Sequence, residues 1–213
     1  MGSKYTLIFV GPMGHGKSSS ANKISGKNLF TVGKKTNSVT QTVVKKTVGY
    51  EWFSDLTLCD CPGFGDQTQP KLFLHQFISQ KKVLLELAPI SAFVMVIKFD
   101  QDQCGPFLVA ARAFVKCFGS QAIKSLFILC IQVNPATEYS DSEFENIFYQ
   151  SDGARHLAEK NDGQHVRFCL WDNKNDSKYP SQAKTFHSLL VKTPEFTKLQ
   201  MQYAFDMIGN QLE

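Results

Sequence analysis

Residues 11–20, GPMGHGKSSS, follow the apolar run YTLIFV at residues 5–10 and indicate the class of fold. The apolar run predicts a buried strand, and residues 17–26 predict a helix that stops at a glycine. The segment between them fits the pattern G-x-x-x-x-G-K-[ST] through Gly11, Gly16, Lys17 and Ser18. Glycines in this pattern let the main chain turn with its N–H groups pointing inward. The segment therefore predicts an anion cradle at a helix N-terminus.

Each residue of this phosphate loop has an expected task. Lys17 would reach the β- and γ-phosphates of a nucleotide, and Ser18 would ligate Mg²⁺. Ser19 is placed to contact the α-phosphate. The other expected nucleotide contacts come from Gly11, Gly14, His15 and Gly16. A glycine-rich turn without a ligand is the alternative, and the position between a strand and a helix favours phosphate binding.

A second segment, LTLCDCPGFGD at residues 56–66, supports the same chemistry. Asp60 ends its apolar strand, where a carboxylate beside the phosphate loop can hold the metal ion, usually through water. Gly63 can offer its N–H to a γ-phosphate, because it has no side chain to block the approach. Between the two segments, residues 36–43 (TNSVTQTV) should supply a threonine that closes over Mg²⁺ and the γ-phosphate. Spacing alone leaves three candidates open: Thr36, Thr40 and Thr42.

The composition bounds the class of protein. With 213 residues, 43% hydrophobic and 20% charged, the chain is expected to be one ordinary globular domain. Its net charge of +4 is weak and scattered, which argues against nucleic acid as a partner. Six cysteines without zinc-site spacing favour a reduced, cytoplasmic protein. No apolar run reaches the ~18 residues that span a bilayer, so no membrane segment is expected.

Strand-like and helix-like segments alternate along the chain. Strands are predicted at residues 5–10, 41–52, 55–60, 90–99, 125–133 and 165–171. Helices are predicted at residues 17–26, 71–87, 107–119, 142–161 with a break near Gly153, 180–193 and 194–212. This alternation predicts an α/β architecture with a mainly parallel sheet. We expect a nucleotide-binding domain over residues 1–192, with residues 193–213 as a C-terminal helix that packs on it or extends from it.

Several stretches resemble, in order, the immunity-associated nucleotide-binding GTPases, the GIMAP/IAN family, which are relatives of septins and of chloroplast import-receptor GTPases. The matching stretches are GPMGHGKSSSANKISGKNLF, NSVTQTV, LTLCDCPGFGD, APISAFVMVIKFDQDQ, FVKCFGSQAIKSLFILCIQVN and HVRFCLWDNKN. The resemblance implies a three-layer αβα P-loop GTPase fold with a mostly parallel six-stranded sheet. It also implies binding of GTP and GDP with Mg²⁺, slow hydrolysis or none, and association into a homodimer or oligomer through the nucleotide face.

The resemblance assigns further roles. It makes Thr40, in the SVT stretch, the switch threonine, so Ser18, Thr40 and Asp60 would form the metal site. Lys17, Thr40 and Gly63 would then act on the reacting phosphate. The family's base-specificity motif usually ends in aspartate, but the aligned IQVN has Asn134 there and Ile131 in place of the threonine. An amide carries no charge, so the charge-assisted pair to guanine is lost and guanine selectivity is open.

The segment LWDNKN aligns with the family's base-contacting loop, so Trp171 or Asn173 would line the purine; a core position for the tryptophan is the alternative. The hydrolytic groups differ from those of glutamine-dependent GTPases, because Phe64 follows Gly63 and a phenyl ring cannot orient a water molecule. Gln67 and Gln69 lie nearby but out of register for that task. The resemblance places Gln101, with Lys98 nearby, where the family often has an arginine, so no arginine finger from a dimer partner is evident. These differences predict slow intrinsic hydrolysis.

Three function classes are consistent with these residues. The favoured one is a switch or assembly GTPase that binds guanine nucleotide. A degenerate pseudo-GTPase scaffold is the second, because the base motif and Phe64 depart from the family pattern. The third, an ATP-using phosphotransferase, would need an arginine-rich lid. The chain has only dispersed arginines, at Arg112, Arg155 and Arg167.

Overall fold

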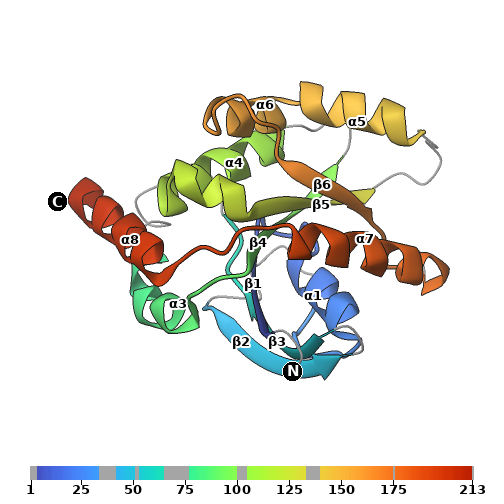
Figure 1. Cartoon of the computed structure of the whole chain (residues 1–213), viewed down its shortest axis with the longest axis horizontal. Helices are drawn as coiled ribbons and strands as arrows, with labels where there is room; N and C mark the ends of the chain where they lie inside the picture. The colour runs from blue at the N-terminus through green and yellow to red at the C-terminus, as the bar shows by residue number, and fades with distance from the viewer. Residues whose placement is uncertain are drawn as a thin grey trace.

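The computed structural model describes residues 4–33, 42–50, 53–64, 77–99, 105–132, 140–174 and 176–212. Within these residues the strands form one six-stranded sheet in the order β2-β3-β1-β4-β5-β6 (Figure 1). The strands are β1 (Lys4–Val10), β2 (Val44–Tyr50), β3 (Phe53–Asp60), β4 (Ala92–Phe99), β5 (Leu126–Gln132) and β6 (Arg167–Trp171). Every neighbouring pair is parallel except the antiparallel pair of β2 and β3. The predicted α/β fold with a mostly parallel six-stranded sheet is confirmed.

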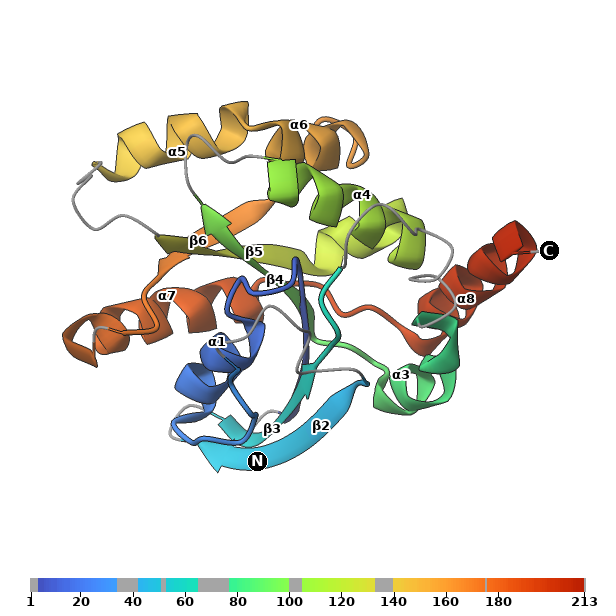
Figure 2. The same ribbon diagram turned by 180° about the vertical axis from the view of Figure 1, so that it is seen from behind.

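Helices cover both faces of the sheet (Figures 1 and 2). The α-helices are α1 (Lys17–Ser25), α3 (Lys81–Leu87), α4 (Gly105–Phe118), α5 (Asp141–Gln150), α6 (Asp152–Glu159), α7 (Tyr179–Val191) and α8 (Lys198–Leu212). Two 3₁₀ helices, η1 (Ser120–Ser125) and η2 (Asp176–Lys178), precede β5 and α7. Helices α4, α5 and α6 lie on one side of the sheet, and α1 and α7 lie on the other.

The alternation of side chains along each strand produces the two cores. In β1, Ile8 and Val10 pack into the cluster that includes α4 and α8, whereas Leu7 and Phe9 pack into the cluster that includes α1 and α7. Strand β4 is buried on both faces, and its side chains from Ala92 to Ile97 are 0% exposed. This explains why its sequence is a nearly continuous apolar run.

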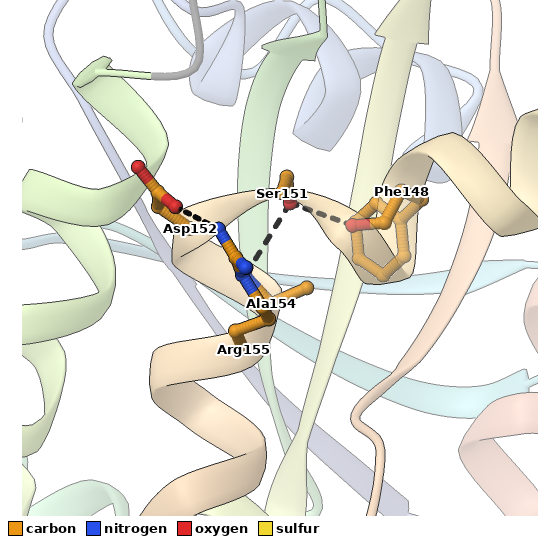
Figure 3. Close-up of polar contacts among 5 residues, drawn as sticks. All are labelled: Phe148, Ser151, Asp152, Ala154 and Arg155. Carbon is orange, nitrogen blue, oxygen red and sulfur yellow. Dashed lines mark hydrogen bonds and ion pairs between the residues drawn. The ribbon is translucent and has the colours of Figure 1, made fainter.

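The break in the helical segment at 142–161 lies at Ser151, two residues before the predicted break near Gly153. Figure 3 shows that the Ser151 hydroxyl donates to the Phe148 carbonyl (2.6 Å) and accepts from the Ala154 N–H (3.4 Å). Ser151 thereby ends α5 and caps α6. Gly153 has a packing role instead, because a Cβ built there would lie 2.5 Å from the Phe107 ring of α4.

The last helix begins four residues later than predicted. Residues 194–197 are not helical, and Phe196 exchanges two main-chain hydrogen bonds with Ile90 (2.9 and 2.8 Å). Helix α8 then packs against α3 and α4, burying Met201, Phe205 and Ile208 in the core cluster that α4 also lines. The proposed division at residue 192 stays a prediction. No helix within the described ranges is both long enough and apolar enough to cross a membrane.

Candidate nucleotide-binding site

The loop after β1 lies at the point where the sheet reverses its winding. Strand β1 is paired in parallel with β3 on one side and with β4 on the other. The chain leaves β1 into α1 on one face, whereas α3, which precedes β4, packs on the opposite face. In parallel α/β sheets the crevice beyond the carboxyl ends of such strands is the usual ligand site. The loop at residues 11–16 therefore occupies the position that the sequence predicted for it.

Three glycines shape this loop. Gly11, Gly14 and Gly16 have φ angles of 127°, 75° and 96°, which side chains rarely allow. Gly11 also passes so close to β4 that a Cβ there would lie 2.4 Å from the Val96 carbonyl oxygen. Gly16 is the N-cap of α1 and supplies no side-chain cap. The N–H groups of the first helical turn thus point to the loop, as an anion cradle requires.

Lys17 is buried beneath the loop. Its ammonium donates to the carbonyl oxygens of Gly11 (3.2 Å) and Pro12 (2.9 Å). Burial lowers the pKa of Lys17, while the carboxylate of Asp60 acts in the opposite direction. Burial destabilises the charged form of this ammonium, and an anion beside it would stabilise that form again. The site therefore favours a bound anion such as phosphate.

Ser18 and Asp60 are brought together from α1 and the end of β3. The Ser18 hydroxyl donates to Asp60 Oδ2 at 2.6 Å. Asp60 is 1% exposed and lies opposite Phe9 in the β1–β3 register. A hydroxyl and a carboxylate are hard oxygen ligands, the kind that Mg²⁺ prefers. The donor set of these two residues fits the Mg²⁺ that the sequence predicted.

The segment after β3 runs beside the phosphate loop. The Phe64 N–H donates to the Gly11 carbonyl oxygen (3.0 Å). Gly63 fits closely against the loop, since a Cβ built there would lie 2.7 Å from Met13 Cα and 3.0 Å from Lys17 Nζ. The Phe64 ring is buried, 6% exposed, in the cluster on the α4 face. Phe64 is thus a core residue, in agreement with its inability to orient a water molecule.

His15 makes a contact that the sequence did not predict. Its Nδ1 accepts a hydrogen bond from the main-chain N–H of Lys98 in β4 (2.9 Å). The ring is half-buried. Burial, and then the charges of Lys98 and Lys17, lower the pKa of His15 from 6.5 to about 4. The imidazole is therefore neutral at neutral pH.

Trp171 lies in the core, the position that the sequence analysis gave as the alternative to base contact. Its side chain is 2% exposed and packs against Phe186 of α7. Its indole N–H donates to Asn173 Oδ1 (2.9 Å), and Asn173 Nδ2 donates to the Ser20 hydroxyl in α1 (3.1 Å). Asn173 thus links the end of β6 to the helix that follows the phosphate loop.

The remaining predicted residues are placed as follows. Ser19 is half-buried in the first turn of α1, Gly14 is exposed at the loop, and Thr42 is exposed. Thr36, Thr40, Gln67, Gln69, Gln101 and Asn134 lie outside the described residues. The sequence missed Ser20 and the main-chain contact of Lys98, because these contacts join residues that are 153 and 83 positions apart. No local pattern signals such pairs.

The cysteines flanking Asp60 are structural. Cys59 and Cys61 are buried free thiols. Burial raises the pKa of Cys59 to about 12 and the pKa of Cys61 well above its usual value. Among the described residues, no group of three or more His, Cys, Asp or Glu side chains could hold a metal ion.

Comparisons with solved structures find the same fold. Toc33 from Arabidopsis thaliana, crystallised with Mg²⁺ and GMPPNP, superposes with a TM-score of 0.60 at 16% identity, over 99% of this chain and 86% of its own. Aquifex aeolicus Era bound to GDP·AlF₄⁻ gives 0.59 at 14% identity, over 92% of this chain and 58% of its own. A GTP-binding protein from Sulfolobus solfataricus in complex with GDP gives 0.55 at 11% identity, over 89% and 53%.

Sequence comparison identifies the family. Among curated protein sequences nothing matches this chain. The family model described as AIG1 family matches residues 5–207, which is nearly the whole chain. That match agrees with the order of the GIMAP/IAN-like stretches and with the P-loop GTPase fold of the neighbouring structures. The chain belongs to the AIG1 family, and its resemblance to GIMAP/IAN-type GTPases is thereby confirmed.

Proposed function

We propose that this protein is a guanine-nucleotide-binding switch or assembly GTPase that takes GTP and GDP with Mg²⁺. The observation that carries the proposal is the Ser18–Asp60 contact of 2.6 Å beside the buried ammonium of Lys17. An oxygen pair for a hard cation and an ammonium for phosphate lie beside one glycine-rich loop at a helix N-terminus, which is the arrangement that a Mg²⁺–nucleotide needs. The solved relatives in complex with GMPPNP and GDP support guanine as the base.

The other site residues take the roles that the sequence suggested. Gly11, Gly14, Gly16 and Ser19 would contact phosphate oxygens, and Gly63 would offer its N–H to the γ-phosphate. Thr40 would complete the Mg²⁺ site with Ser18 and Asp60, and Asn134 would contact the base. When bound, Mg²⁺ would supply charge neutralisation on the phosphate oxygens. Lys17 adds a second positive charge at the same phosphates.

We propose that hydrolysis is slow and that assembly is part of the activity. The buried Phe64 supports slow hydrolysis, because the position after Gly63 holds no group that could orient an attacking water. Association is supported by the chloroplast translocon components atToc33 and psToc159, since dimerization is important for their GTPase activity. We extend that behaviour to this chain as a proposal.

Nucleotide binding tests the proposal directly. Fluorescent GTP and GDP should bind the purified protein only with Mg²⁺ present, and unlabelled GTP should compete far better than ATP. Lys17→Ala should abolish binding, whereas Lys124→Ala, in η1 on the amino side of β5, should leave it unchanged. Binding of ATP with equal strength would favour the phosphotransferase, and the absence of binding would overturn the proposal.

A second measurement separates the GTPase from the pseudo-GTPase. The turnover rate per protomer should rise with protein concentration if association assists hydrolysis. Light scattering should then show dimers with a non-hydrolysable GTP analogue and monomers with GDP. Turnover at the rate of buffer alone, at every concentration, would leave the scaffold as the function.

A further inference from the structure

His15 lies between the two most permissive residues of the phosphate loop. Gly14 and Gly16 flank it with φ angles of 75° and 96°, and glycine visits such conformations without holding them. Met13 is 45% exposed, and nothing lies within 4 Å of a Cβ built at Gly14. Packing against Gly63 therefore holds the Met13 main chain, whereas little packs against Gly14. A loop that must present its amides to phosphate in one arrangement needs an attachment here.

That attachment is the hydrogen bond from the Lys98 N–H to His15 Nδ1 (2.9 Å). Strand β1 ends at Val10, which lies opposite Met95 in β4, so β4 extends beyond its partner. The Lys98 N–H lies in this extension, and the His15 side chain satisfies it in place of a strand. A second close approach, between Gly11 and the Val96 carbonyl, lies on the same strand. The loop thus meets β4 at two points.

The donor and acceptor roles fix the state of the ring. A main-chain N–H can only donate, so the ring nitrogen that faces it carries no proton. The proton of the neutral ring is then on Nε2. The neighbouring cations Lys17 and Lys98 and the burial of the ring all lower the pKa of His15 and oppose a second proton. The contact therefore persists at neutral pH.

We propose that His15 is a positioning residue: through Nδ1 it clamps the phosphate loop to the end of β4 and holds the amides at Gly14 and Gly16 in the conformation that binds phosphate. The clamp is a property of the protein without nucleotide. Its consequence for affinity rests on the proposed function. Lys98 takes part through its main chain, so its side chain is free to change.

Two nearly isosteric substitutions separate the clamp from the bulk of the ring. In His15→Asn, Oδ1 occupies the same place along the side chain as Nδ1 and can accept from Lys98. In His15→Leu, a methyl group replaces that acceptor. Amide hydrogen exchange in the nucleotide-free protein should be about tenfold faster at Lys98 in His15→Leu and unchanged in His15→Asn. The N–H groups of Ile97 and Phe99 point toward β5, because main-chain groups alternate along a strand. Unchanged exchange at these two amides would show that the sheet remains folded.

Nucleotide affinity then shows whether the clamp holds the loop in the conformation that binds phosphate. GDP should dissociate several-fold faster from His15→Leu than from wild type, with His15→Asn within about twofold of wild type. Lys98→Ala, which keeps the main-chain N–H, should match wild type in exchange at residue 98. Wild-type exchange at Lys98 in His15→Leu would overturn the clamp. Equal loss of affinity in both His15 variants would overturn positioning and show that the ring itself contacts the nucleotide.

The clamp and the proposed nucleotide-binding function can be tested independently of each other. If the wild-type protein binds no nucleotide, the exchange measurement still decides whether His15 clamps the loop. Long-range nitrogen–proton NMR spectra provide an independent check, because the clamp requires the Nε2-protonated tautomer at pH 7. A ring protonated on Nδ1 would contradict the hydrogen bond to Lys98.

Discussion

Replacing Gly63 with alanine tests how closely the segment after β3 fits the phosphate loop. The new Cβ would lie 2.7 Å from Met13 Cα and 2.8 Å from Met13 N. Carbon atoms normally approach to about 3.5–4.0 Å, so the overlap approaches 1 Å. Both contacted atoms are main chain, and no side chain can turn away to relieve it. Either the phosphate loop or the segment after β3 must move.

The size of this overlap determines how much Gly63→Ala should destabilise the protein. Overpacking of this kind costs about 1–3 kcal/mol of unfolding free energy. For a chain of this length, each kcal/mol lowers Tm by about 2–4 °C, so we expect Gly63→Ala to melt roughly 2–12 °C below wild type. The displaced N–H of residue 63 should also reduce affinity for GTP more than for GDP, because only GTP has the γ-phosphate. A hydrogen bond to a charged group contributes about 1.5–3 kcal/mol, or at least tenfold in the GTP/GDP affinity ratio.

Gly105→Ala is the matched control, because nothing lies within 4 Å of a Cβ built at the start of α4. It should melt at or slightly above the wild-type temperature and keep the wild-type affinity ratio. The measurements are calorimetric Tm without nucleotide and Kd values for GTP and GDP with Mg²⁺. A Gly63→Ala protein that melts with wild type and keeps its GTP/GDP ratio would refute the close fit of the two segments.

The metal site, the last helix and the histidine of the phosphate loop each give a further prediction. Asp60→Asn keeps an oxygen for the Ser18 hydroxyl but removes the charge, so Mg²⁺ affinity in the nucleotide complex should fall about 10- to 100-fold in a metal titration, and an unchanged titration would contradict the metal role. Gly209→Ala, in α8 with open space around its Cβ, should raise the unfolding free energy by about 0.5–1 kcal/mol in urea; a decrease would mean that the helix face is packed. Because the pKa of His15 is lowered from 6.5 to about 4, the unfolded chain binds more protons between those pH values, so stability should be lost as pH falls from about 6.5 to 4. The unfolding free energies of wild type and His15→Asn, measured by urea titration at several pH values, should differ increasingly as pH falls through that window. Above pH 6.5 the difference between them should be constant.

The sequence predicted those parts of the site that depend on neighbours along the chain. Gly11, Lys17 and Ser18 lie within eight consecutive residues between one strand and one helix, so the local sequence pattern predicts their geometry. Asp60 was predictable because the carboxyl ends of adjacent parallel strands meet at one edge. The sequence also predicted a strand at residues 41–52, where β2 lies, although it predicted neither the antiparallel direction of β2 nor its pairing with β3.

Contacts that depend on the tertiary fold were not predictable. Trp171 and Asn173 lie two residues apart, yet one faces the core and the other faces α1. Composition and spacing are the same for a base-contacting and a buried tryptophan, and only the position of α7 decides between them. Gly153 was likewise predicted to break a helix, whereas in the structure it leaves room for the Phe107 ring. That contact depends on how α4 packs against α6, which the local sequence does not show.

The charges of the site explain why binding and stability should be linked in this protein. An ammonium, Lys17, and a carboxylate, Asp60, are both buried within one cluster of contacts, and burial alone destabilises each charge. The lowered pKa of Lys17 shows that the attraction of Asp60 does not offset the burial of the ammonium. A metal ion at Asp60 and phosphates at Lys17 would place an opposite charge beside each. A bound nucleotide would then offset the burial of both charges, and the free energy of unfolding would rise with the logarithm of nucleotide concentration.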